Sequence, residues 1–175
     1  LLTVFLYCKK YDVRLSKMTD IIVPGLILAQ AIGRWGNFFN SEAHGQATTL
    51  ANLKSLGFIP DFVIKGMNIN GIYYEPTFFY ESIWCIIGFI ILIIMRNNKK
   101  TKVGSLTATY LMFYSVGRFF IESKRTDSLM LGGLKMAQII SIIMFIIGLI
   151  IIMINRRKGQ FDDNYQETNL DNVRF

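Results

Sequence analysis

The sequence contains little charge for its length. Acidic and basic residues make up 18% of its 175 residues, against about 25% in an average soluble domain. Two stretches, IWCIIGFIILIIM (83–95) and MAQIISIIMFIIGLIIIMI (136–154), contain no acidic or basic residue. With their flanking residues they reach the roughly 20 helical residues that cross a hydrocarbon core of about 30 Å. The scarcity of charge therefore argues against a soluble domain and predicts transmembrane helices.

Cysteine and histidine are also scarce. Cys8 and Cys85 lie far apart in apolar segments, and His44 is the single histidine. No spacing matches a disulfide framework or a metal site, and no glycine-rich phosphate loop or nucleotide fingerprint is present. We therefore expect neither a metal nor an organic cofactor, and we interpret His44 as a packing or solvent-facing residue.

Two further apolar segments are interrupted by polar residues. Residues 21–39 include a proline, three glycines and Arg34, and residues 103–122 include Arg118 and Glu122. Polar groups within a span must face protein or a wet cavity. The apolar opening LLTVFLYC resembles the last turns of another span. It does not resemble a signal peptide, because no basic region precedes it. We predict an all-α polytopic membrane protein with about four transmembrane helices plus the end of a fifth.

Basic residues are distributed unevenly around these spans. Eleven flank one set of helix ends, whereas the alternate connections 41–76 and 123–133 hold four. Because cytoplasmic loops are enriched in Lys and Arg, we predict that both connections are external and that the C-terminus is cytoplasmic. The formal net charge of +7 then reflects topology, and nucleic-acid binding is not expected. The eleven are Lys9, Lys10, Arg14, Lys17, Arg96, Lys99, Lys100, Lys102, Arg156, Arg157 and Lys158.

The longer external connection is expected to fold. Residues 47–56 are compatible with a short surface helix, and FVIKGMNINGIYY (62–74) has two apolar runs around Asn-Gly, a hairpin signal. We therefore predict a transmembrane domain over residues 1–158 with an external helix and hairpin appendage over 41–76. The polar, aperiodic segment 159–175 is predicted to be a disordered cytoplasmic tail.

This topology brings polar residues of three spans to one depth near the outer surface. Charge inside a span costs several kcal/mol even on mild scales, of order 3 kcal/mol per residue, so such convergence indicates a site. Arginines at headgroup depth are suited to holding a phosphate through forked donors. The residues are Arg34, Asn37, Asn40, Glu42, Tyr80, Glu81, Arg118, Glu122 and Arg125.

Structural interpretations of the same residues remain open. Arg118 and Glu122 are four residues apart on one helix and can pair with each other. Arg34 can extend to the interface without binding a ligand. A channel or transporter with arginines along an anion path is a further alternative, although the apolar spans 83–95 and 136–154 offer it few polar groups at mid-depth.

Three ordered motifs resemble one family. GRWGNFFNSEAHG (33–45) fills every fixed position of G-R-x-G-N-F-x-N-x-E-x-x-G, the signature of prolipoprotein diacylglyceryl transferases. EPTFFYES (75–82) and YSVGRFFIESKRTDSL (114–129) are similar to two later blocks of that family, and Asp20 and Pro24 match its usual lead-in.

The resemblance implies an activity and a set of site residues. The family transfers the diacylglyceryl group of phosphatidylglycerol to the lipobox cysteine of a prolipoprotein, forming a thioether and releasing glycerol phosphate. By position, Arg34, Arg118 and Glu42 would be catalytic. The lipid would be bound by the residues Arg34, Asn37, Asn40, Gly45, Tyr80, Glu81, Tyr114, Arg118, Glu122 and Arg125.

The same resemblance bears on what lies outside the chain. The family usually has about seven spans, and its earlier half carries a histidine-glycine motif whose histidine is a candidate base for the thiol. We therefore interpret the chain as a C-terminal fragment that begins inside a membrane helix. A truncated product without a base, and hence without activity, is the alternative within this fold.

Overall fold

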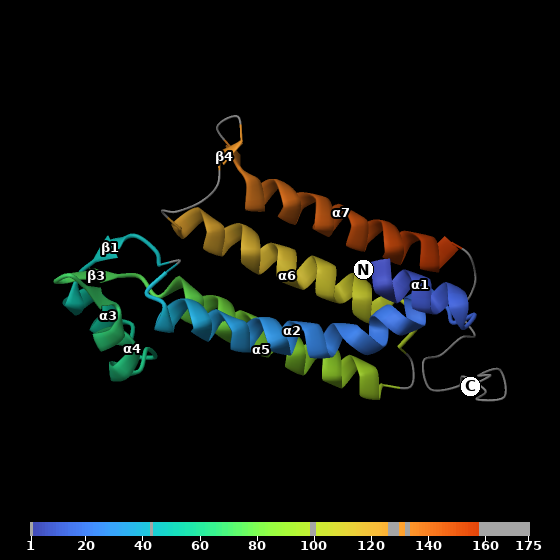
Figure 1. The fold of residues 1–175 in the computed structure, drawn as a ribbon, viewed down its shortest axis with the longest axis horizontal. Coiled ribbons are helices and arrows are strands. Elements are labelled where there is room, and N and C mark those ends of the chain that lie inside the picture. The colour runs from blue at the N-terminus through green and yellow to red at the C-terminus, as the bar shows by residue number, and fades with distance from the viewer. Residues whose placement is uncertain (1, 43, 99–100, 126–129, 132–133, 158–175) are drawn as a thin grey trace.

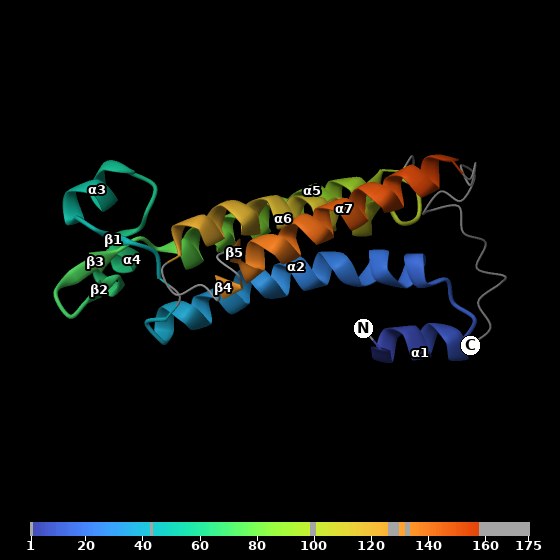
Figure 2. The ribbon, with the colours of Figure 1, turned by 90° about the horizontal axis from the view of Figure 1, so that it is seen from above.

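The computed structural model describes residues 2–42, 44–98, 101–125, 130–131 and 134–157. Four long helices lie side by side in it: α2 (Leu15–Phe39), α5 (Thr77–Asn97), α6 (Ser105–Lys124) and α7 (Met136–Arg157). The short helix α1 (Leu2–Lys10) lies beside the start of α2 (Figures 1 and 2). The prediction of an all-α polytopic membrane protein is confirmed, and the tail 159–175 lies outside the described residues.

Three of these helices are long and apolar enough to cross a membrane: Leu15–Phe39, Thr77–Asn97 and Met136–Ile154. Helix α6 has a similar length, 20 residues, with more polar side chains, and it lies between α5 and α7 (Figure 1). Many isoleucines of α7 are exposed in the structure, among them Ile142, Ile143 and Ile146. Apolar side chains of this kind are suited to a hydrocarbon environment.

The core between the long helices follows helical spacing. Val23, Ile27 and Ala31 recur at every fourth position of α2 and are buried against Cys85 of α5 and Leu106 of α6. Close approach of α5 and α6 depends on Gly117, because a Cβ there would lie 2.2 Å from the indole nitrogen of Trp84. Small residues at such crossings are the usual means of packing membrane helices.

The appendage is built from two short helices and a three-stranded sheet at one end of the bundle, called here the appendage end (Figure 2). Its elements are β1 (Ala47–Thr48), α3 (Leu50–Ser55), α4 (Asp61–Gly66), β2 (Asn68–Ile69) and β3 (Ile72–Tyr74), with sheet order β1-β3-β2. A second hairpin, β4 (Met130–Leu131) with β5 (Leu134–Lys135), precedes α7.

The predicted hairpin is present but shorter than expected. Ile69 pairs with Ile72 across Asn70 and Gly71, whose φ angles of 52° and 84° suit a two-residue turn of type I′. Residues 62–66, predicted as a strand, belong instead to helix α4. The prediction failed there because Val63, Ile64 and Met67 are buried at helical spacing, which overrides the strand preference of β-branched residues.

Aromatic side chains attach the appendage to the long helices. Trp35 of α2 contacts Phe78 of α5 at 5.4 Å and Phe62 of α4 at 6.1 Å between ring centroids. The indole N–H of Trp35 donates to Ser82 Oγ at 3.2 Å. Trp35 is therefore a packing residue that joins three elements.

At the opposite end of the bundle, Asp20 of α2 caps the first turn of α6. Its fully buried carboxylate accepts hydrogen bonds from Gly104 N at 2.6 Å, Thr107 N at 2.9 Å and Thr107 Oγ1 at 2.5 Å. The first N–H groups of a helix lack partners inside the helix, and a carboxylate there is favoured by the helix dipole. Asp20 thereby fixes how far α6 is shifted along α2.

We expect Asp20→Ala to destabilise the protein by about 3 kcal/mol, because it leaves buried donors without an acceptor. Asp20→Asn keeps one acceptor oxygen and should lose about half as much. Tryptophan fluorescence during thermal unfolding of the detergent-purified protein measures the order wild type, Asn, Ala. Equal midpoints for wild type and Asp20→Ala would show that α6 does not depend on this cap.

Candidate functional site

A buried carboxylate joins three helices at the appendage end. Glu81 of α5 lies 2.6 Å from Arg34 Nη2 of α2 and 3.2 Å from Arg118 Nη1 of α6. The Glu81 side chain is 4% exposed, whereas Arg34 and Arg118 are 22% and 17% exposed. The structure thus brings together three of the residues predicted to lie at one depth, and the arginines keep an accessible side.

A second carboxylate extends this network along α6. Glu122 Oε2 lies 2.7 Å from Arg118 Nη2 and 4.0 Å from Arg125 Nη1. Glu122 is 3% exposed, and its Oε2 has an ion-pair distance but no aligned hydrogen bond. Arg118 therefore does pair with Glu122 of its own helix, as the spacing allowed. It also pairs with Glu81 of α5, so its ion pairs connect two helices.

Tyrosines continue the polar contacts from this network into the bundle. Arg34 Nη2 lies 3.5 Å from Tyr114 Oη, and the Tyr114 ring stacks on Tyr110 at 5.7 Å. Tyr110 Oη in turn exchanges hydrogen bonds of 3.0 and 3.2 Å with the Gln30 amide. These side chains hold α2 and α6 together and aim Arg34 toward Glu81.

The network keeps guanidinium N–H donors on its accessible side. Among the described residues, Arg34, Arg118 and Arg125 lie against the carboxylates of Glu81 and Glu122. Arginine stays protonated at any physiological pH, and the side chains of Arg34 and Arg118 remain 22% and 17% exposed. Guanidinium groups that are charged and partly exposed can accept an anion through paired N–H donors.

Asn37, Asn40 and Glu42 lie beside this network rather than in it. Asn37 is half-buried in the last turns of α2, and Asn40 and Glu42 are exposed just beyond its end. Among the described residues their side chains form no hydrogen bond or ion pair, so they do not pair with the arginines. Their backbone N–H groups close the helix, for example Glu42 N to Asn37 O at 2.9 Å.

Gly45 and Tyr80 have clear structural surroundings. Gly45 donates its N–H to Glu75 O at 2.9 Å and forms a β-bridge with Arg125, and a Cβ on it would lie 2.8 Å from Glu75 Cβ. Tyr80 lies beside Phe58, at 6.1 Å between ring centroids, and Lys124, whose Nζ is 5.9 Å from its ring. Gly45 thus ties the chain after α2 to the arginine cluster, whereas Tyr80 faces the appendage.

Sequence reasoning missed Lys135, which caps the end of α6. Lys135 Nζ donates to the carbonyls of Glu122 and Arg125, each at 2.7 Å. A cation at the C-terminal end of a helix satisfies carbonyls that lack partners and interacts favourably with the dipole. The available signal was a lone lysine directly before an apolar span. His44, as interpreted from the sequence, packs against the Tyr74 ring at 4.1 Å.

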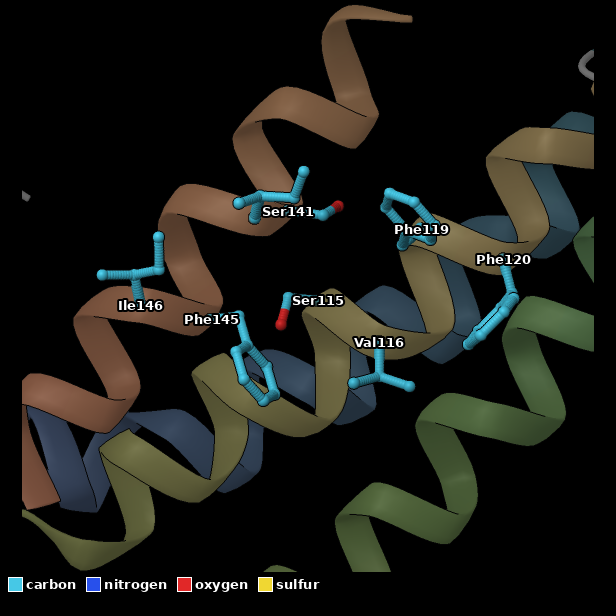
Figure 3. A pocket seen from close by; sticks show the side chains of 8 residues that line it. Ser115, Val116, Phe119, Phe120, Ser141, Phe145 and Ile146 are labelled. Carbon is cyan, nitrogen blue, oxygen red and sulfur yellow. The ribbon is translucent and has the colours of Figure 1, made fainter.

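An apolar groove lies on a neighbouring face of α6 (Figure 3). It encloses about 430 Å³ between α6 and α7, and Val116, Phe119 and Phe145 contribute to its walls. The hydroxyls of Ser115 and Ser141 in it donate to carbonyls of their own helices, at 2.9 and 2.7 Å. The groove is therefore lined by apolar groups. It lies on a face of α6 next to the one that carries Arg118.

Comparison with known proteins identifies relatives over nearly the whole chain. The family model described as "Prolipoprotein diacylglyceryl transferase" matches residues 1–154. A phosphatidylglycerol–prolipoprotein diacylglyceryl transferase of Bacillus cereus (strain G9842) is 49% identical over 166 residues, 95% of this chain and 61% of the relative. One of Ligilactobacillus salivarius (strain UCC118) is 51% identical over 156 residues, 89% of this chain and 58% of the relative. The chain spans about three fifths of these relatives.

We expect Glu81→Gln to destabilise the protein by about 3 kcal/mol, because it removes the charge that holds two partly buried guanidinium groups. Glu42→Gln is the matched control: it makes the same change at an exposed position, where the effect should stay within about 0.5 kcal/mol. Thermal unfolding of both variants in the same detergent compares them. Similar midpoints for the two variants would contradict a structural role for the Glu81 bridge.

Proposed function

This chain belongs to the prolipoprotein diacylglyceryl transferase family, and on that premise we propose that the protein carrying it transfers diacylglyceryl groups. The donor is phosphatidylglycerol and the acceptor is the lipobox cysteine of a prolipoprotein. The reaction is the first step of bacterial lipoprotein maturation. The observation that carries the proposal is the arginine cluster, which holds two partly exposed guanidinium groups at one end of a bundle of membrane helices.

The arginine cluster acts on the phosphate of the lipid. Arg34 and Arg118 bind the phosphodiester, and Asn37, Asn40 and Tyr114 contribute polar groups for the headgroup. During transfer the cysteine sulfur forms a bond to the glyceryl carbon of the diacylglyceryl group that carries the phosphate. The bond from this carbon to the phosphate oxygen breaks, and glycerol phosphate leaves with added negative charge. Donors fixed in advance around that charge lower the barrier, and the ion pairs with Glu81 and Glu122 hold Arg118 in place.

A base must take the proton of the thiol, whose ordinary pKa is about 8.5. Glu81 and Glu122 are poorly suited, because both carboxylates are held by guanidinium groups. Glu42 is exposed and has no such partner among the described residues, which supports its proposed catalytic role. By resemblance to the family, a second candidate for this base is a histidine in the N-terminal half of the family's sequences.

A channel or transporter accounts less well for the polar groups. A conducting path needs polar atoms that face its lumen. Asp20 lies at the opposite end of the bundle, and the Gln30–Tyr110 pair lies between the two ends. Their polar atoms, however, are used in hydrogen bonds between α2 and α6. An inactive truncated product remains the alternative within the family. Transfer activity measured with the protein that the complete gene encodes would exclude this alternative.

We expect Arg34→Ala and Arg118→Ala each to lower the transfer rate by about 10²- to 10³-fold, the loss typical of one electrostatic donor. Arg34→Lys should recover part of the rate, because it keeps the charge and loses the fork. The assay follows labelled diacylglyceryl from phosphatidylglycerol to the cysteine of a lipobox peptide, with the full-length protein. Lys65→Ala, on the exposed face of the appendage, is the control, and an Arg34→Ala variant as active as this control would contradict the proposal.

The proposed location is the bacterial cell (inner) membrane, with the appendage end outside and the C-terminus in the cytoplasm. Positive residues at the opposite end support this orientation. Lys9 and Lys10 end α1, and Lys17 and Arg96 lie near the ends of α2 and α5.

Labelling of single cysteines tests the orientation. In a protein with Cys8 and Cys85 replaced by serine, Lys65→Cys should react with a membrane-impermeant maleimide in intact cells. Lys102→Cys should react only after the membrane is permeabilised, because the spans place it on the other side. Labelling of position 102 in intact cells would reverse the orientation.

A further inference from the structure

A pocket of mixed polar and apolar lining lies between the appendage and the ends of α5 and α6. It has a volume of about 440 Å³ and is bounded on one side by α3, through Asn52 and Ser55, and on the other by Glu75, Tyr80 and Lys124. Lys124 Nζ lies 3.2 Å from Glu75 Oε2, which joins the two segments below the pocket. The function proposed above uses none of this space.

The pocket adjoins the arginine cluster along the chain. Tyr80 directly precedes Glu81 on α5, and Lys124 directly precedes Arg125 at the end of α6. Consecutive residues of a helix point about 100° apart, so the two sites occupy neighbouring faces of the same helix ends. A molecule that reacts at the arginine cluster can therefore extend into the pocket without leaving the protein.

The chemistry of the pocket differs from that of the cluster. Its wall carries one acid and one base, Glu75 and Lys124, already paired with each other, so it has no surplus charge to attract an anion. Asn52 and Thr48 add an amide and a hydroxyl that can both donate and accept. The Ser55 hydroxyl already donates to Asn52 O at 2.8 Å and remains an acceptor, and Leu53, Leu56 and Phe58 add apolar surface. A peptide, whose backbone alternates donors and acceptors and whose side chains can be apolar, matches this wall better than a phosphate does.

Position selects the peptide over the lipid. The pocket is lined by residues of α3, which lies at the appendage end of the bundle (Figure 2). The apolar region of an exported signal segment stays at membrane depth, which places its reactive cysteine near the arginine cluster. The residues after the cysteine then continue outward, on the side where the pocket opens.

We propose that this pocket binds, in extended form, the residues of the acceptor polypeptide that follow its modified cysteine. The inference rests on the proposed function for the identity of the acceptor. Neutral groups that can donate and accept hydrogen bonds accommodate a variable sequence through its backbone.

Binding of a labelled peptide tests this proposal without depending on catalysis. The probe is a fluorescein-labelled synthetic peptide with an apolar segment, a lipobox with Ser in place of Cys, and about eight following residues. A second probe ends at that Ser. Fluorescence anisotropy with the full-length protein in detergent should show the long probe binding about tenfold more tightly than the short one, a difference in Kd that one or two backbone contacts supply.

Asn52→Trp places a bulky ring in the pocket and should bind the long probe only as well as the short one. Ser55→Trp fills the same wall one turn along α3 and serves as a second variant. Asn68→Trp is the matched control, because Asn68 is exposed on β2 of the same appendage and does not line the pocket. It should retain the wild-type difference between the probes.

Two results would overturn the proposal: equal binding of both probes by the wild type, or an unchanged preference for the long probe in both pocket variants. The second result includes an equal loss of affinity for both probes, because the ratio of the two Kd values then stays as in the wild type. Transfer activity of the wild type with the cysteine-containing peptide is measured separately. A protein that discriminates between the probes but transfers nothing would refute the proposed function and leave the peptide pocket standing.

Discussion

The site depends on one buried carboxylate. Glu81 is the only described contact shared by Arg34 of α2 and Arg118 of α6, at 2.6 and 3.2 Å, and it therefore sets the separation of the two guanidinium groups. Without it, two partly buried cations would repel each other across the helix interface. With it, and with Glu122, they are held close together and each still keeps an accessible side. That combination makes the end of the bundle both stable and receptive to an anion.

The two ends of the α2–α6 pair use carboxylates in different ways. Asp20 is surrounded by neutral donors that it fully uses, and it has no accessible side. The cluster around Glu81 leaves two arginines partly exposed. Polar residues inside a membrane protein are often functional. Here the two groups differ in whether they keep hydrogen-bonding groups available: Asp20 does not and positions α6, whereas the cluster at the other end of α6 does and can bind a ligand.

Hydrophobic runs and charge asymmetry were sufficient to predict the long helices and the shared depth of Arg34, Glu81 and Arg118. They could not show which polar residue would bridge the others, since that depends on side-chain distances. Glu42 and Tyr80 share the motifs but form no ion pair or hydrogen bond with the arginines among the described residues. Helix α4 was misread because its β-branched residues favour a strand until packing against the aromatic cluster is considered.

In the proposed function, two unlike substrates share one end of the bundle, and the arrangement of charge suits this. Tyr80 and Glu81 are adjacent on α5, yet Tyr80 borders a pocket whose acid and base neutralise each other, and Glu81 lies between two partly exposed guanidinium groups. An anionic headgroup gains more at the cluster than in the pocket, whereas a neutral peptide backbone gains little from the guanidinium groups. In that proposal each face favours one substrate over the other, and both are bound at once with their reacting atoms at the boundary between the faces.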